Sequence, residues 1–297
     1  MKVEEALYFF RKNKNLKQKE ILTYTDTSVY SRIENGKKLL RFSELRDILE
    51  RFSVPLVEFS EYLDDDLEQK YFRSLLQKYK VNDRDPQMKK ELLAYYHTLN
   101  FSEAMPIERM SNYVVIKTLL SSRWAEISPL KQSELDIIFH LLHAKKYFFQ
   151  YDYALLSHTI FLFEQPKIDH LAKKALPVKN MNLRNTATKE FIKNMVNNLI
   201  TMLLRKKEYE LSSYYLTIAT SQLDEIHDLS YKVVLDYLKN LTQYLSTGEK
   251  QYKSAIFESI DYLTKVGEHN LAVSIQTEVE SILLNNDTVP IFIQADL

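Results

Sequence analysis

The sequence predicts an all-α protein, and three observations lead to that fold class. Glycine occurs only 3 times and proline 7 times among 297 residues, whereas a sheet-rich protein of this length needs many glycine-containing turns. Apolar residues recur at helical spacing along most of the chain. Hydrophobic residues make up 45% of the sequence, which supports a folded core and argues against a disordered chain.

Charge and composition exclude several classes of protein. Residues 1–60 hold 12 Lys and Arg against 9 Asp and Glu, so their net charge is +3, and the remainder of the chain carries −3. This tilt is compatible with a DNA-binding N-terminus. Cysteine is absent, which excludes disulfides, cysteine-ligated zinc and thiol nucleophiles. No Gly-rich phosphate loop or Ser/His/Asp arrangement stands out, so we expect no enzyme, no metal and no cofactor.

Targeting signals and membrane spans are not expected either. The N-terminal stretch "MKVEEALYFF" is too charged for a signal peptide. No apolar run is long enough to cross a bilayer. We therefore expect a cytoplasmic protein with no membrane contact.

Residues 1–62 predict five short helices. The first runs from 3 to 12 with Ala6, Leu7 and Phe10 on one face, and the second covers 17–23. Asp26 is placed to cap the third helix, and Gly36 suits the left-handed position that ends it. The fourth helix is expected to begin at a Ser43 cap and the fifth at Pro55, ending near Tyr62.

The third helix, within "TDTSVYSRIENGKK", has little to bury. Only Val29 and Ile33, four residues apart, are expected to hold it to the domain. The other side chains of this helix are short and polar or long and basic. Those expected to point outward are Thr27, Ser28, Tyr30, Ser31 and Arg32.

The stretch "LKQKEILTYTDTSVYSRIENGKK" resembles the Cro/C1-type helix-turn-helix (HTH). Its "SRIENG" ending, Ser31 to Gly36, is complete, and the resemblance covers residues 3–60. The span from Gln18 to Gly36 is about two residues shorter than the commonest spacing, so the turn is expected to be tighter. In this motif the third helix enters the major groove, and DNA is bound by dimers on a near-palindromic operator.

The resemblance implies a set of DNA-binding residues. Short hydroxyls let the helix sit deep, and Arg32 is suited to pair with a guanine or a phosphate. Residues at the start of the second helix and after Gly36 are expected to meet phosphates. The full set is Lys17, Gln18, Thr27, Ser28, Tyr30, Ser31, Arg32, Lys37, Lys38 and Arg41.

The rest of the chain predicts a linker helix over 63–85, helical repeats over 86–285 and an apolar tail over 286–297. Tyr209 and Tyr252 occupy matching places in two similar helix pairs, which indicates TPR-like repeats that leave a concave groove. The tail could dock on that groove, which we favour, exchange with a partner chain, or remain disordered. The expected repeat helices are 86–100, 106–122, 130–148, 151–164, 167–176, 187–206, 208–225, 229–246, 250–266 and 268–285.

An HTH followed by about 220 residues of helical repeats resembles the RRNPP group of peptide-pheromone-responsive regulators, and within it the Rgg (MutR-like) branch, with the plasmid pheromone receptors second. The resemblance implies a homodimeric transcription regulator controlled by an imported signalling peptide (quorum sensing). The alternative is a TPR-type adaptor that binds proteins without pheromone control. The "SRIENG" helix argues against it.

Asparagine side chains are the candidates for holding an extended peptide, since each offers a donor and an acceptor to the peptide backbone. Asn194, Asn197 and Asn198 recur at i, i+3, i+4 within one predicted helix, where asparagine is a poor helix former and needs a reason. Alternatively, these asparagines face solvent or form hydrogen bonds between helices. Related groups on the following repeat are Tyr237, Asn240 and Tyr244.

Overall fold

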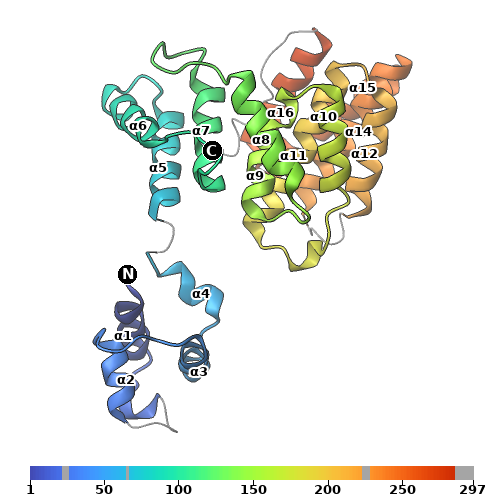
Figure 1. Ribbon diagram of the computed structural model, residues 1–297. Helices are drawn as coiled ribbons and strands as arrows, with labels where there is room; N and C mark the ends of the chain where they lie inside the picture. The colour runs from blue at the N-terminus through green and yellow to red at the C-terminus, as the bar shows by residue number, and fades with distance from the viewer. Residues whose placement is uncertain (22–26, 65–66, 223–227, 285–297) are drawn as a thin grey trace. The chain divides into compact units, whose positions relative to one another are not determined.

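The structure is a computed structural model that describes residues 1–21, 27–64, 67–222 and 228–284. The described residues form α-helices and short 3₁₀-helices and no strand. The chain divides into two units, Met1–Tyr71 and Phe72–Leu297, each with its own core. The predicted all-α fold class is confirmed (Figure 1).

The first unit is built from short helices with clear end signals. Asn15 and Ser53 have positive φ (54° each) just after two of these helices, and Gly36 has φ 67° after another, as expected for left-handed chain reversal. Pro55 precedes the last helix of the set, as predicted. The elements are α1 (Val3–Asn13), the 3₁₀-helix η1 (Gln18–Glu20), α2 (Thr27–Glu34), α3 (Phe42–Phe52) and α4 (Leu56–Glu61).

Two details of these helices differ from the prediction. Ser43 does not cap α3, because the helix already begins at Phe42 and Arg41 takes the cap position. The backbone N–H of Arg41 instead donates to the carboxylate of Glu44 (3.0 Å). The second helix is described only as the single turn of η1, and the predicted cap Asp26 lies outside the described residues.

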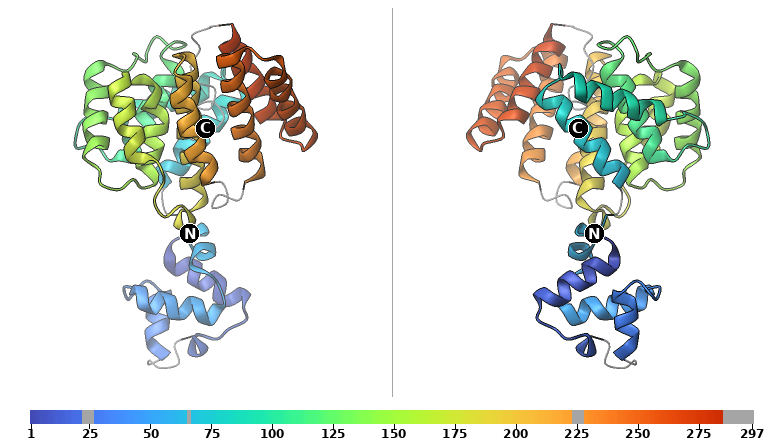
Figure 2. Two further views of the ribbon diagram at one scale, coloured as in Figure 1. Left: turned by 90° about the vertical axis from the view of Figure 1, so that its right-hand side faces the viewer. Right: turned by 90° about the vertical axis from the view of Figure 1, so that its left-hand side faces the viewer.

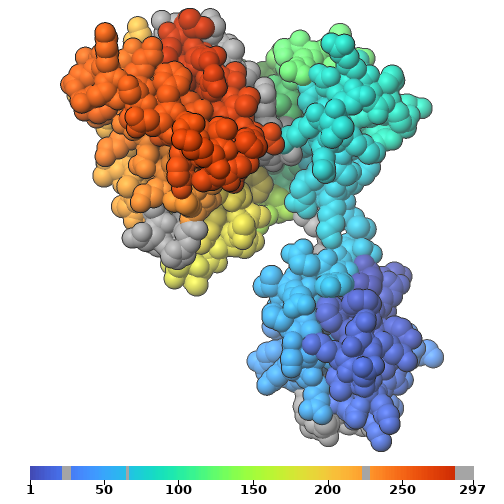
Figure 3. Space-filling view, turned by 180° about the vertical axis from the view of Figure 1, so that it is seen from behind, coloured from blue at the N-terminus to red at the C-terminus, as the bar shows by residue number. Residues whose placement is uncertain are grey.

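The core of the first unit gathers apolar side chains from each of the helices α1, α2, α3 and α4. The predicted inward residues Ala6, Leu7 and Phe10 are buried, and Phe10 packs against Phe59 with ring centroids 5.6 Å apart. In the space-filling view the side chains of this unit, coloured in shades of blue, form one continuous body (Figure 3). The buried cluster is Ala6, Leu7, Phe10, Ile21, Tyr30, Ile33, Ile48, Leu49, Phe52, Val54, Phe59 and Leu63.

The second unit is a succession of helices, and each segment predicted between 86 and 285 overlaps one of them to within two residues at its start. The chain enters it through α5 (Leu67–Val81), within the predicted linker. The helices that follow are α6 (Pro86–Thr98), α7 (Ile107–Leu120), α8 (Gln132–Ala144), α9 (Gln150–Thr159), α10 (Gln165–Ala175), α11 (Thr186–Arg205), α12 (Tyr209–Ser221), α14 (Leu229–Thr247), α15 (Lys250–Lys265) and α16 (His269–Leu283).

Alternate helices of the second unit neighbour one another, as repeats of helix pairs require. Helices α7, α9, α11 and α14 contact each other in sequence order, while α12 and α15 pack beside them (Figure 2). The TPR-like prediction is therefore confirmed at the level of fold. The predicted apolar tail, 286–297, lies outside the described residues.

A buried ion pair fastens two of these helices. Lys117 of α7 is 1% exposed, and its ammonium contacts both oxygens of Glu134 on α8 (2.9 and 2.8 Å). The hydroxyl of Tyr113 donates to the same carboxylate (2.6 Å). Such a pair is compensated only while both partners are present.

Candidate functional sites

Helix α2 presents the predicted DNA-reading face in part. Ser28 and Arg32 are exposed and Ser31 is partly exposed. Thr27 is the first residue of the helix. Ile33 is buried as predicted, whereas Val29 is only partly buried.

Tyr30 was predicted to point outward, and that expectation is wrong. Its side chain is fully buried, and its hydroxyl donates to Glu34 (3.3 Å). The reason is helical geometry, since Tyr30 lies on the same face as Ile33 and Glu34, three and four residues on. Burial raises the pKa of the phenol. Tyr30 therefore holds α2 in place and does not reach DNA.

Glu34 is the centre of a network that the sequence reading missed. Arg11 of α1 donates to both of its oxygens, from Nε (2.6 Å) and from a terminal nitrogen (3.0 Å). The amide of Gln18 donates to the same carboxylate. Gln18, predicted to contact phosphate, thus fixes the start of η1 against the end of α2. The only sequence signal for this network was Glu34 itself, the acidic residue within the "SRIENG" stretch.

The predicted phosphate contacts fall into two groups. Lys17, Lys37 and Arg41 are exposed. Lys38 instead pairs with Glu44, and this hydrogen bond lowers the pKa of that carboxyl. The charge of Lys38 is therefore already compensated within the unit.

The three asparagines of α11 do not share one role. All are buried, but only Asn194 and Asn197 line a cavity of about 270 Å³. Asn198 turns toward α9, where its amide donates to the carbonyl of Ser157 (2.9 Å). A spacing of i, i+3, i+4 spreads side chains over an arc of the helix, and here the arc reaches a neighbouring helix. Asn198 is a contact between repeats.

The predicted groups on α14 lie away from this cavity. Tyr237 is fully buried, and its hydroxyl donates to Glu278 of α16 (2.8 Å). The amide of Asn240 donates to Asp236 one turn back in its own helix (2.9 Å). The ring of Tyr244 lies under the ammonium of Lys253 (5.9 Å). None of the three lines the cavity, because the cavity lies at the other end of α14, near its first turn.

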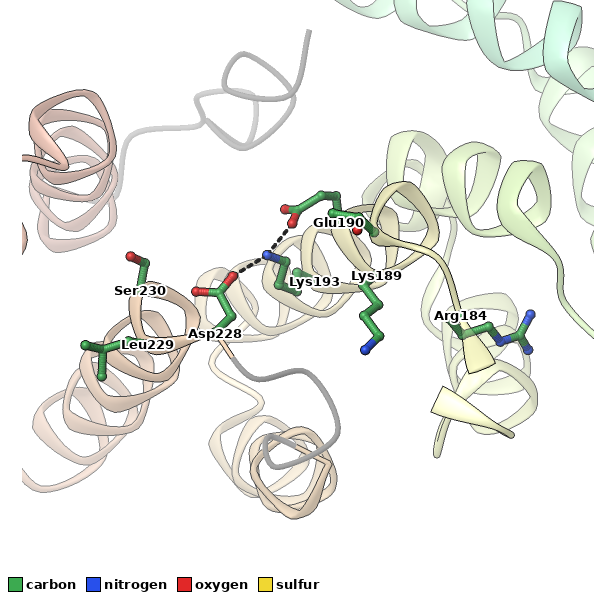
Figure 4. A pocket seen from close by; sticks show the side chains of 8 residues that line it. Arg184, Lys189, Glu190, Lys193, Asp228, Leu229 and Ser230 are labelled. Carbon is green, nitrogen blue, oxygen red and sulfur yellow. Dashed lines mark hydrogen bonds and ion pairs between the residues drawn. The ribbon is translucent and has the colours of Figure 1, made fainter. Parts of the chain in front are cut away.

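A chain of charges that the sequence reading also missed crosses the cavity instead. Figure 4 shows the ammonium of Lys193 between the carboxylates of Glu190 and Asp228, and both distances are 2.6 Å. Burial disfavours the charge of Lys193, but the hydrogen bonds to Asp228 and Glu190 outweigh it and raise the pKa of the ammonium. Asp228 also caps α14 by accepting from the backbone N–H of Tyr231 (3.0 Å).

The cavity joins a second one of about 370 Å³, with which it shares Glu190, Lys193, Asp228 and Ser230. The first also takes in Tyr231, Val234, Glu268 and Leu271, so it lies between α11, α14 and α16. The second extends to the start of α11 at Arg184, Thr186 and Lys189. Together they form one groove with polar and charged walls, which we call the α11 groove.

A family model for the C-terminal domain of the HTH-type transcriptional regulator Rgg matches residues 96–277. The chain belongs to the Rgg family of transcriptional regulators. The matched residues cover α7 to α15, most of the second unit, and the groove lies among them. None of the curated proteins matches this chain.

Solved structures show the same fold at 17% identity. The SHP pheromone receptor Rgg2 of Streptococcus dysgalactiae has a TM-score of 0.75, with 94% of this chain and 99% of that one covered. The PrgX/cCF10 complex has a TM-score of 0.78, covering 97% and 94%. A bacterial peptide pheromone/receptor complex has a TM-score of 0.76, covering 95% and 98%.

Two further features of the described part of the chain bear on other functions. No described helix is long and apolar enough to cross a membrane. His143 and His170 stack with ring centroids 4.5 Å apart, but the described residues include no group of three ligand-type side chains that could hold a metal ion.

Proposed function

We propose that this Rgg-family regulator binds a short linear peptide in the α11 groove and that the peptide controls its action on promoter DNA. The observation that carries the proposal is the amide oxygen of Asn197, which is buried in the groove and accepts no hydrogen bond from the described residues. A buried acceptor without a partner is costly, and a backbone N–H of a bound peptide would satisfy it.

Structures of the same fold agree with this proposal. One structure of this fold is a bacterial peptide pheromone/receptor complex, and another is a complex of PrgX with cCF10. Most side chains that line the groove are polar or charged, which suits a peptide backbone and its ends better than a lipid or an apolar drug-like molecule. Of the predicted peptide contacts, we retain Asn194 and Asn197.

Calorimetry with short synthetic peptides, including any encoded beside this gene, tests the proposal. Asn197→Ala removes the unpaired acceptor and is expected to weaken binding about tenfold. Asn240→Ala is the matched control, because that amide bonds within its own helix outside the groove. Equal affinity of wild type and Asn197→Ala for a bound peptide would contradict the assignment.

For the first unit, we propose that α2 enters the major groove and that Ser28, Ser31 and Arg32 contact base edges, with Thr27 at the start of the helix beside them. Lys17, Lys37 and Arg41 are proposed to bind phosphates. Because one such helix reads few base pairs, we propose a homodimer on a near-palindromic operator with half-sites about one helical turn or a multiple apart.

Gel shifts on promoter fragments test this part separately. Arg32→Ala is expected to weaken specific binding by about tenfold or more, since a good bidentate contact contributes roughly 1–3 kcal/mol. Lys239→Ala, which removes a positive charge from an exposed position of α14, is the control. An Arg32→Ala protein that binds its operator like wild type would overturn the placement of α2.

A further inference from the structure

The charges along the α11 groove are unevenly compensated. In its middle, Lys193 is neutralised by Glu190 and Asp228. At the end beside the start of α11, Arg184 has no ion pair among the described residues. Its guanidinium donates only to the carbonyl of Lys179 (3.1 Å) and lies over Tyr147. At the inner end, Glu268 likewise has no ion pair with any described residue.

The inner end also holds the unpaired acceptor. Asn197 is 2% exposed and its Oδ1 accepts no hydrogen bond in the described part of the chain. It lines the same cavity as the carboxylate of Glu268. A carboxylate together with an amide oxygen calls for a group with several N–H donors and a positive charge, and a primary ammonium has three such donors.

We propose that the α11 groove binds its peptide in one direction, with the free α-ammonium at Glu268 and Asn197 and the α-carboxylate toward Arg184. This inference rests on the proposed peptide-binding function. Thr186 and Asn197 are 11 residues apart on α11, which is roughly 16 Å at a rise of about 1.5 Å per residue. An extended peptide covers that length with about five residues.

The same ammonium chemistry could come from a lysine side chain within the peptide. We assign the terminus, because Glu268 and Asn197 line one end of the groove and Arg184 lines the other, and the two ends of one short peptide carry an ammonium and a carboxylate that match them. The guanidinium of Arg184 matches a carboxylate at the other end, since its planar fork suits bidentate pairing.

The test uses the full chain and a pool of synthetic peptides of about five residues that lack Lys, Arg and His. Peptides retained by the protein are identified by mass spectrometry and remade with free ends, with an acetylated N-terminus and with an amidated C-terminus. N-acetylation is expected to weaken binding about tenfold, the loss typical of a charged hydrogen bond. A second pool containing Lys shows whether a lysine side chain rescues the acetylated peptides.

Variants locate the effect. In Glu268→Gln, free and acetylated peptides are expected to bind within about twofold of each other, and in Arg184→Gln the same is expected for free and amidated peptides. Arg184→Lys keeps the charge and is expected to retain the preference for a free carboxylate. Glu258→Gln, at an exposed position of α15, is the control for charge alone.

The outcomes separate the two proposals. If wild-type protein binds acetylated and free peptides equally, the direction proposed here is overturned while peptide binding stands. Rescue of acetylated peptides by an internal lysine assigns the inner end to a side chain and also overturns the direction. If no peptide from either pool is retained, both proposals fail.

Discussion

The burial of Glu278 predicts how the free energy of unfolding of the second unit depends on pH. It lies on α16 with no exposed surface and accepts a hydrogen bond from Tyr237 of α14 (2.8 Å). Burial raises the pKa of Glu278 from 4.5 to about 7, although the hydroxyls of Tyr237 and Thr201 and the charge of Arg205 on α11 oppose the shift. Replacing it by Gln keeps the shape and removes the titration.

The sign and size of the effect follow from the two pKa values. Between pH 4.5 and about 7 the folded chain holds a proton on Glu278 that the unfolded chain has lost, so stability falls as the pH rises through this window. The destabilisation of the wild type from this group is about 1 kcal/mol at pH 5 and about 3 kcal/mol at pH 8, using about 1.4 kcal/mol per pKa unit.

Urea unfolding, followed by the fluorescence of Trp124, measures the free energy of unfolding at each pH. It is the only tryptophan of the chain and is buried in the second unit, so the signal reports on that unit. Glu278→Gln is expected to gain about 2 kcal/mol on the wild type between pH 5 and pH 8. Glu280→Gln, an exposed neighbour on α16, should follow the wild type. Parallel pH curves for Glu278→Gln and wild type would refute the reasoning.

Three other predictions concern the cores and one turn. Glu34→Ala leaves Arg11 buried without its partner and is expected to destabilise the first unit by roughly 3–5 kcal/mol. The measurement is backbone hydrogen exchange over residues 1–64, which is expected to become faster. Glu58→Ala, at an exposed position, is the control, and equally slow exchange in both variants would contradict the prediction. Lys117→Met leaves Glu134 buried without its cation and is expected to cost the second unit roughly 3–5 kcal/mol in the Trp124 assay. Part of this loss is expected to return in the double variant Lys117→Met/Glu134→Leu, because Tyr113 and the backbone N–H of Lys131 also lose their acceptor there; a double variant no more stable than Lys117→Met would contradict this account. Gly36→Ala places a side chain at φ 67° and is expected to destabilise the first unit by about 1 kcal/mol. Gly36→Asn is expected to cost less, because asparagine tolerates the left-handed region better. Equal hydrogen-exchange rates in the two variants would contradict this difference.

Helical periodicity was sufficient to predict the fold. The spacing of apolar residues located each repeat helix, and Gly36 marked the end of α2, because burial and backbone conformation act on neighbours within one turn. The errors came from contacts between helices. Tyr30 was assigned to the surface because an amphiphilic ring is compatible with either side of a short helix. Its spacing places it on the face of Ile33 and Glu34, but only the contact of Glu34 with Arg11 of α1 shows that this part of the face is buried.

The groove shows the same limit. Asparagines at helical spacing indicated a polar stripe on α11, and two of the three do line the groove. Asn198 and Tyr237 bond instead to Ser157 and Glu278, which are 41 residues away in each case, so no local pattern indicates these contacts. The ion chain through Lys193 depends on Asp228, 35 residues further on, and no local pattern connects the two.

The two hydrogen bonds of Asp228 restrict which residues can replace it during evolution. One carboxylate oxygen caps α14 by accepting from the backbone N–H of Tyr231, and the other accepts from the ammonium of Lys193 (2.6 Å). Serine, threonine or asparagine would still start the helix but would leave the lysine with less compensation. Glutamate would bring the charge on a longer arm that caps helices poorly. Aspartate alone combines both properties, so drift at residue 228 is expected to alter the groove before it alters the fold.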